Sequence, residues 1–222
     1  LRVGIPSNVT GLLDEIIDPQ YATTVGLILQ GRKNIINQES GVKKFNKILK
    51  VLAFQSGQLL NVASLSRETG ISQPTLHKYL SILEETFIIK MITPFSRSPS
   101  VEISKNPKIF FLDSGLQSLL WLGQFQNIIQ GNIFETNIFS ELVKKYGREV
   151  IHFWRTKIHQ EIDFIIEYEM GKILPIEVKI NFQKFNVRTM KSFCNKYKIK
   201  DWKVIGLEGT KATKNDIYPW EI

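Results

Sequence analysis

Three acidic residues and one lysine have the types and the spacing that metal-dependent cleavage of a phosphodiester needs. They are Glu135, Asp163, Glu177 and Lys179, referred to below as the tetrad. Hard divalent cations such as Mg²⁺ bind carboxylate oxygens, and a bound metal ion makes a water molecule more acidic. A lysine stabilises negative charge that develops in a transition state. The tetrad therefore predicts a nuclease site that uses Mg²⁺ or Mn²⁺, provided that the fold brings the four side chains together.

A β-hairpin is predicted to bring two of the carboxylates together. Residues 161–167 and 173–180 are two β-rich runs, and the five residues between them include a turn-forming glycine. If those five residues form the loop, counting back along both strands places Asp163 opposite Glu177, on one face. Like charges directly opposite each other destabilise a sheet. A divalent cation bound between the two carboxylates would explain why this pairing is tolerated.

The second strand of the hairpin is predicted to separate apolar from charged side chains. Its even-numbered residues from 174 to 180 are apolar and share one face, whereas Glu177 and Lys179 share the other. We expect Asp163 and Glu177 to hold the metal ion together with the carbonyl of Val178, and Lys179 to orient the attacking water or stabilise the transition state. The alternative is that this charged face is simply exposed to solvent, with Glu177 and Lys179 as a solvated pair.

The fourth member of the tetrad is predicted to lie on a helix. Residues 133–146 have a helical pattern, and Glu135 falls on the stripe that also carries Phe139 and Leu142. A carboxylate on an inward stripe is costly unless it is paired or bound to a metal. Glu135 is therefore expected to reach the other carboxylates as an outer or second-metal ligand.

The composition is that of a globular protein with a basic surface. Of 222 residues, 43% are hydrophobic, and the formal net charge is +8, which favours a polyanionic partner such as DNA. Cys194 is the single cysteine, which excludes a disulfide framework and a thiolate metal site. No stretch approaches the roughly 18 apolar residues of a membrane span, and the first residues do not form a signal peptide. A cytoplasmic protein without a membrane partner is therefore expected.

A helix-turn-helix is predicted in the middle of the chain. Asn61 is a good N-cap for a helix over residues 62–69, and Gly70 supplies the turn that follows it. Ser72 is then predicted to cap a second helix over residues 73–84, whose leucines 76, 80 and 83 share one inward face. A preceding helix over residues 42–54 and strand-like runs at 87–92 and 108–112 complete a winged helix.

Two groups of exposed residues are candidates for contact with DNA. On the second helix of the winged helix they are Gln73, Thr75 and Lys78. On the helix that follows the hairpin they are Lys184, Arg188 and Lys191, a basic stripe suited to phosphates. The alternative is that the three-helix module binds another protein and that the basic stripe is only a solvated face.

The C-terminal part of the chain has the element order of a known nuclease fold. Residues 131–222 are predicted to form a helix, three strands, a helix and a strand, in which residues 201–207 are the last core strand and Trp220 is a packing anchor. This order resembles the PD-(D/E)XK nuclease-like fold, with the tetrad at its four motif positions. The predicted class is α+β or α/β, with a winged helix at 41–112 followed by a restriction-endonuclease-like αβββαβ domain at 113–222.

Several longer stretches extend this resemblance from about residue 45 to residue 222. They include Ile71-Ser-Gln-Pro-Thr-Leu-His-Lys-Tyr-Leu80, Lys105-Asn-Pro-Lys-Ile-Phe-Phe-Leu-Asp-Ser-Gly115, Glu161-Ile-Asp-Phe164 and Ile176-Glu-Val-Lys179. This part of the chain resembles the domain of unknown function found behind an AAA+ ATPase module in many bacterial and archaeal proteins. The resemblance implies a winged helix joined to a nuclease-like domain, normally worked by an attached ATPase.

The chain departs from that family in two ways. It contains no Gly-x4-Gly-Lys-Ser/Thr motif, so no ATPase activity is expected. His159 and Gln160 also stand where the family usually has a glycine before its Glu-x-Asp. The four tetrad positions are present. Without the ATPase module, the resemblance does not imply that their activity is regulated.

The first residues have a different resemblance. Residues 1–31, and Pro19 to Leu27 above all, resemble the last conserved stretch of the actin-like cell-division ATPase FtsA. The phosphate-binding loops of that family do not occur in this sequence. Residues 1–40 are therefore interpreted as an FtsA-like remnant and linker, and a role in division is rejected unless an actin-like core lies upstream.

The leading hypothesis is a DNA-binding, Mg²⁺-dependent nuclease-like portion of an AAA+ family ATPase that lacks its ATPase module. One alternative is a non-catalytic module that binds nucleic acid or protein. Another is an interaction partner for an ATPase that is encoded elsewhere. Nothing in the sequence predicts a substrate sequence or an oligomeric state.

Overall fold

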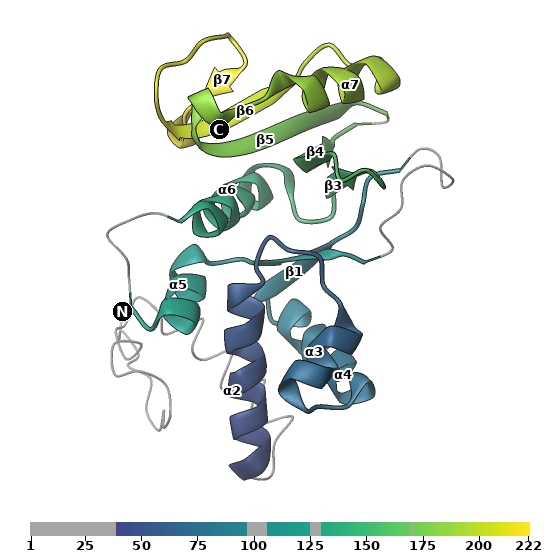
Figure 1. The fold of residues 1–222 in the computed structure, drawn as a ribbon, viewed down its shortest axis with the longest axis vertical. Helices are drawn as coiled ribbons and strands as arrows, with labels where there is room; N and C mark the ends of the chain where they lie inside the picture. The colour runs from purple at the N-terminus through teal and green to yellow at the C-terminus, as the bar shows by residue number, and fades with distance from the viewer. Residues whose placement is uncertain (1–38, 97–105, 125–129, 170) are drawn as a thin grey trace.

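The protein is described by a computed structural model that covers residues 39–96, 106–124, 130–169 and 171–222 (Figure 1). These residues form a mixed α and β structure with six α-helices, α2 to α7, and two sheets. The FtsA-like stretch and most of the linker predicted at 1–40 lie outside the described residues. None of the described helices is long and apolar enough to cross a membrane.

The N-terminal half contains helices and a two-stranded antiparallel sheet. Its elements are α2 (Glu39–Phe54), α3 (Val62–Thr69), α4 (Gln73–Glu85), β1 (Ile89–Ile92), β2 (Lys108–Phe111) and α5 (Ser114–Leu122). The first five lie within three residues of the predicted ranges, whereas α5 was not predicted. The leucines at 76, 80 and 83 of α4 are buried, as predicted.

Local capping explains where α3 begins and ends, and a proline explains where α4 begins. The Asn61 side chain accepts a hydrogen bond from the amide of Ser64 at 2.9 Å, and Gly70 ends α3 in the left-handed region with φ of 72°. Ser72 differs from the prediction, since its hydroxyl bonds the hydroxyl of Thr75 at 2.8 Å instead of a backbone amide. The fixed geometry of Pro74 in the first turn still favours the start of α4.

The C-terminal half contains a five-stranded sheet in the order β3-β4-β5-β6-β7. Its elements are α6 (Gly131–Tyr146), β3 (Ile151–Arg155), β4 (Glu161–Glu167), β5 (Ile173–Asn181), η3 (Phe182–Lys184), α7 (Val187–Tyr197), β6 (Lys203–Glu208), β7 (Asp216–Ile217) and η4 (Pro219–Glu221). Strands β3, β4 and β5 are antiparallel, whereas β5, β6 and β7 run parallel. The predicted order of helix, three strands, helix and strand is therefore observed, with β7 added.

Two apolar cores place α6 and α7 against this sheet, on opposite sides in Figure 1. The core beneath α6 includes Phe139, Phe164 and Ile176. The core beneath α7 includes Phe193 and Trp154, whose rings pack edge to face with centroids 5.1 Å apart. Burial of both faces fixes the direction in which each strand presents its polar side chains.

The predicted register of the β4–β5 hairpin is confirmed. The four pairs from Phe164 with Ile176 to Glu167 with Ile173 follow the predicted pairing. The turn uses left-handed backbone at Glu169 and Gly171, with φ of 63° and 79°. The paired residues end just before Asp163 and Glu177, where the carboxylate of Asp163 accepts a hydrogen bond from the amide of Val178.

The two halves share a core and backbone hydrogen bonds. After β1 the chain runs beside β3, where the amide of Phe95 donates to the carbonyl of Phe153 at 2.6 Å. Ile92 from β1 and Phe110 from β2 pack in the same core as α6. The hydroxyls of Ser56 and Thr136, both fully buried, are hydrogen-bonded at 2.8 Å. Side chains of the N-terminal half therefore reach the sheet of the C-terminal half in a fixed geometry.

The prediction that Trp220 anchors the chain end is wrong. Its side chain is 73% exposed and stacks on Tyr218 with ring centroids 4.8 Å apart. Tyr218 itself packs against Phe182. Because Tyr218 takes the position against the body of the protein, Trp220 is left on the outside.

Candidate functional site

Asp163 lies where the ladder between β4 and β5 ends. Beyond the last pair, Phe164 with Ile176, its carboxylate accepts a hydrogen bond from the amide of Val178 at 2.8 Å. The side chain is 15% exposed. This bond holds one carboxylate oxygen of Asp163 against β5 at Val178, the residue between Glu177 and Lys179.

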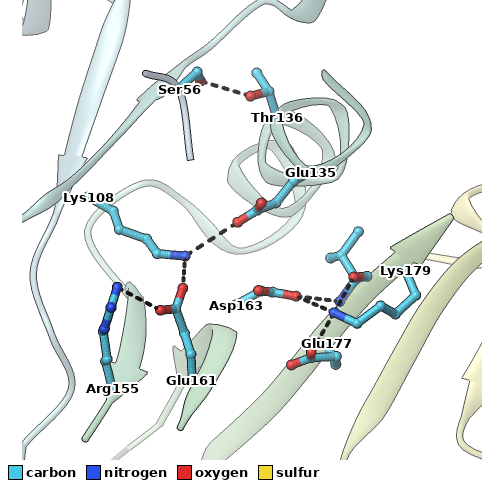
Figure 2. Close-up of polar contacts among 10 residues, drawn as sticks. Ser56, Lys108, Glu135, Thr136, Arg155, Glu161, Asp163, Glu177 and Lys179 are labelled. Atoms are coloured by element: carbon cyan, nitrogen blue, oxygen red, sulfur yellow. Dashed lines mark hydrogen bonds and ion pairs between the residues drawn. The ribbon is translucent and has the colours of Figure 1, made fainter. Parts of the chain in front are cut away.

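Lys179 connects two of the predicted site carboxylates (Figure 2). Its ammonium donates to Glu177 Oε1 at 2.6 Å and to the carbonyl of Val178 at 3.0 Å. The same nitrogen lies 3.8 Å from Asp163 Oδ2. Three members of the tetrad therefore meet in one network of ion pairs and hydrogen bonds.

The strand that carries Glu177 and Lys179 is held from its other side by β6. Glu177 pairs with Val204, and Lys179 pairs with Gly206. A β carbon on Gly206 would lie 2.5 Å from the ring of Phe182, so only glycine lets this ring pack so close to β6. The close packing of Phe182 fixes the end of β5, which lies two residues beyond Lys179.

Glu135 lies apart from the other three members of the tetrad. Its Oε1 is 3.5 Å from the ammonium of Lys108, a residue of β2 in the N-terminal half. The backbone of Gly57, with φ of 83°, packs against the Glu135 carboxylate, and a β carbon there would lie 3.2 Å from Oε2. The helix does bring Glu135 to the site, but its ion pair is with Lys108 and not with Lys179.

Lys108 is a charged residue of this region to which sequence reasoning gave no role. Its side chain is 3% exposed and also lies 2.5 Å from Glu161 Oε1, while Arg155 lies 3.1 Å from Glu161 Oε2. We call Lys108, Glu135, Glu161 and Arg155 the Lys108 cluster. In Figure 2, Asp163 lies between this cluster and Lys179. In the sequence, the sign that Lys108 could be buried is its place directly before three apolar residues of a strand-like run.

Burial and neighbouring charges shift the pKa values of these groups. Burial raises the pKa of Glu135, the charges of Asp163 and Glu161 add to this, and Lys108 opposes it. Burial and the charge of Asp163 raise the pKa of Glu177 to about 7, against the influence of Lys179. Burial disfavours the two ammonium groups, but the surrounding carboxylates outweigh it and raise the pKa of Lys108 and of Lys179. Both lysines therefore carry their charge at neutral pH.

His159 is one of the two residues, with Gln160, at which the resemblance led us to expect a glycine. Its φ is 61°, in the left-handed region that side chains rarely adopt. Its Nδ1 lies 2.9 Å from Nη2 of Arg155, the residue that contacts Glu161. A residue with strained backbone therefore lies beside the Lys108 cluster, while Glu161 and Asp163 keep their places in β4.

The residues predicted to contact DNA do not form one surface. Gln73 and Lys78 are exposed on α4, and Thr75 is partly buried. Lys184 is exposed in η3 and not in α7, while Arg188 and Lys191 are exposed on α7. Helices α4 and α7 lie toward opposite ends of the molecule in Figure 1.

The donor atoms around Lys179 fit a hard divalent cation. Among the described residues no three His, Cys, Asp or Glu side chains gather into a metal-binding group, so Glu135 does not complete a three-carboxylate set. Two carboxylates and the Val178 carbonyl do converge on one point, which the Lys179 ammonium now contacts. Carboxylate and carbonyl oxygens, completed by water, are the ligands that Mg²⁺ accepts.

Two family models match the chain, each over less than half of its length. Residues 33–127 match a domain of unknown function, DUF8612. Residues 130–220 match a second domain of unknown function, DUF4143, which is commonly found C-terminal to AAA ATPases. The first range covers α2 to α5, and the second covers α6 and the five-stranded sheet.

Curated relatives match only parts of the chain. Uncharacterised proteins of Mycobacterium tuberculosis and Mycobacterium bovis are each 26% identical over 147 residues, which is 64% of this chain and 33% of theirs. The chain thus spans about a third of the length of these relatives. The cell division protein FtsA of Escherichia coli is 43% identical over 44 residues, 20% of this chain and 10% of FtsA. No solved structure matches the chain.

Proposed function

We propose that this chain is a DNA-binding, Mg²⁺-dependent nuclease-like portion of an AAA+ family ATPase. The observation that carries the proposal is the convergence of Asp163, Glu177 and the Val178 carbonyl at the ammonium of Lys179. The match to a domain commonly found behind AAA ATPases supports the proposed ATPase partner.

The arrangement of elements supports the finer assignment of the two halves. Helices α2, α3 and α4 followed by the β1–β2 sheet have the order of a winged helix. Helix α6, strands β3 to β5, helix α7 and strand β6 have the αβββαβ order of the PD-(D/E)XK fold. We therefore assign DNA binding to the first half and phosphodiester cleavage to the second.

The residues of the site have separate roles in cleavage. Asp163, Glu177 and the Val178 carbonyl would hold Mg²⁺, which supplies positive charge and a more acidic water. The amide of Val178 fixes one oxygen of Asp163, and so orients that carboxylate before DNA binds. Lys179, charged at neutral pH, stabilises the negative charge that builds on the phosphoryl oxygens as water attacks phosphorus and the ester oxygen leaves.

Polar and basic side chains on α4, η3 and α7 account for DNA binding in this proposal. Gln73, Thr75 and Lys78 would contact DNA from α4, as in other helix-turn-helix modules. Lys184, Arg188 and Lys191 would contact phosphates near the cleavage site. The formal net charge of +8 favours this polyanionic partner.

Mg²⁺ binding and plasmid nicking, measured on the same samples, test the proposal. The wild type is expected to bind Mg²⁺ in calorimetry and to nick supercoiled plasmid in Mg²⁺ but not in EDTA. Asp163→Asn removes one ligand charge, so we expect affinity for Mg²⁺ to fall by at least about 10-fold, since even outer groups of metal sites have effects of this size. Nicking should fall with it. Asp201→Asn, at an exposed aspartate, is the matched control.

Absence of Mg²⁺ binding by the wild type would contradict the proposed site. It would favour a non-catalytic module that binds nucleic acid or protein. Binding would then depend on α4 and on a partner ATPase. One observation favours this second candidate, because Lys179 already neutralises Glu177 and Lys108 already neutralises Glu135. In that case Asp163→Asn would leave DNA binding unchanged.

Affinity for Mg²⁺ is expected to rise with pH between 5 and 8. A proton on Glu177 competes with the metal for the same carboxylate, and burial and the charge of Asp163 raise its pKa to about 7. Apparent affinity should therefore fall about 10-fold for each pH unit below 7 and level off above pH 8. Calorimetry at pH 6 and pH 8 measures this difference. Equal affinities at both values would show that Glu177 does not lose a proton when the metal binds.

A further inference from the structure

Lys108 is the most deeply buried charged group near the proposed site. Its side chain is 3% exposed, compared with 31% for Lys179. It contacts Glu161 at 2.5 Å and Glu135 at 3.5 Å, and the charge of Asp163 also acts on it. One lysine from the N-terminal half thus forms ion pairs with two carboxylates of the C-terminal half.

Lys108 is held in place by its strand and by two aromatic rings. It pairs with Ile92 in the β1–β2 sheet and also forms an isolated antiparallel bridge with Leu59. Its ammonium lies 6.0 Å from the ring centroid of Phe110 and 5.6 Å from that of Phe153. Aromatic faces attract a cation at such distances. A half-exposed lysine can turn toward solvent when a ligand arrives, whereas Lys108 has no such freedom.

We propose that Lys108 is the built-in cation of Glu135 and Glu161, so that the site accepts a single divalent ion at Asp163 and Glu177. This inference rests on the proposed function, since it concerns the number of ions at that same site. It assigns Glu135 to Lys108 as a positioning residue and not to a second metal ion. A divalent ion between Glu135 and Glu161 would have to displace an ammonium that is fixed by the N-terminal half.

The number of bound Mn²⁺ ions in Lys108→Met tests this proposal. Methionine keeps much of the length of the lysine and removes its charge. We expect the wild type to bind one Mn²⁺ and Lys108→Met to bind two, because Glu135 and Glu161 then lose the ammonium that lies between them. Binding is measured by calorimetry and, independently, by loss of the electron paramagnetic resonance signal of free Mn²⁺. Neither readout depends on cleavage.

Two further variants control for indirect effects. Lys90→Met removes a lysine from β1 that is 14% exposed and paired with Glu84 and Glu149, and it should leave one Mn²⁺. Lys108→Met combined with Glu135→Gln removes a carboxylate of the vacated position and should return the number to one. If Lys108→Met does not fold alone, Mn²⁺ is expected to restore its folding, and failure at saturating Mn²⁺ counts against the proposal.

The outcomes separate this inference from the proposed function. One ion in both the wild type and Lys108→Met, or two ions in the wild type, overturns the role of Lys108 and leaves the Asp163–Glu177 site intact. No ion in the wild type but one in Lys108→Met supports the role of Lys108 and overturns the proposed metal site. No ion in either protein overturns both.

Discussion

Lys179→Met is expected to slow plasmid nicking by about 10²–10³-fold, the cost of removing one group that stabilises charge in a transition state. Its ammonium sits 2.6 Å from Glu177 and 3.8 Å from Asp163, where the scissile phosphate would approach the metal ligands. Binding of Mg²⁺ should persist or tighten, because the variant lacks an ammonium that attracts the same carboxylates. Single-turnover nicking at saturating Mg²⁺ measures the first effect, and calorimetry measures the second.

Lys184→Met is the matched control for this experiment. It removes an exposed lysine from η3, near the end of the same strand, and should affect DNA affinity more than the rate of cleavage. If Lys179→Met nicks DNA as fast as the wild type, the charged face of β5 is a solvated pair without a catalytic role. Nicking that is lost together with Mg²⁺ binding would make Lys179 a residue that positions the metal ligands.

The part of the site around Lys179 could be predicted because its determinants are local. Two β-rich runs and Gly171 define a short hairpin, and the hairpin register follows once the loop is placed. Alternation along β5 then sets Glu177 and Lys179 on one side. The alternation of residues does not predict the hydrogen bond from the amide of Val178 to Asp163. That bond depends on where the pairing of β4 with β5 ends.

The surroundings of Glu135 could not be predicted because they depend on the packing of the two halves. A lysine before an apolar run looks like the exposed start of a strand, yet Lys108 is buried against α6 and β4. Its position follows from the contact between β1 and β3 and from the shared core, both of which join residues far apart in sequence. The sequence did indicate that Glu135, on an inward stripe of its helix, needs a partner. That partner is the ammonium of Lys108 and not the predicted metal ion.

Lys108→Met is expected to lower the free energy of unfolding by about 3–5 kcal/mol, the cost of removing one partner of a buried ion pair. Glu161 would keep its ion pair with Arg155 at 3.1 Å. Glu135 would lose the residue that now opposes the rise in its pKa. The change is measured by urea denaturation at pH 7 in the absence of divalent ions. Lys90→Met, which breaks ion pairs with better-exposed partners, should cost about 1 kcal/mol or less.

Removing the charge of Glu135 as well should restore much of the free energy of unfolding that Lys108→Met loses. Lys108→Met with Glu135→Gln leaves no uncompensated carboxylate on α6, so the double variant should be more stable than Lys108→Met alone. The cost of Lys108→Met should also shrink at pH 4. When folding raises the pKa of a carboxyl, the folded protein loses stability as pH rises from the unfolded-state pKa toward the folded-state pKa. The protein regains that stability at low pH, where the carboxyl is protonated in both states. A cost that is equal at pH 4 and pH 7, and is unaffected by Glu135→Gln, would mean that Lys108 acts through its packing and not through its charge.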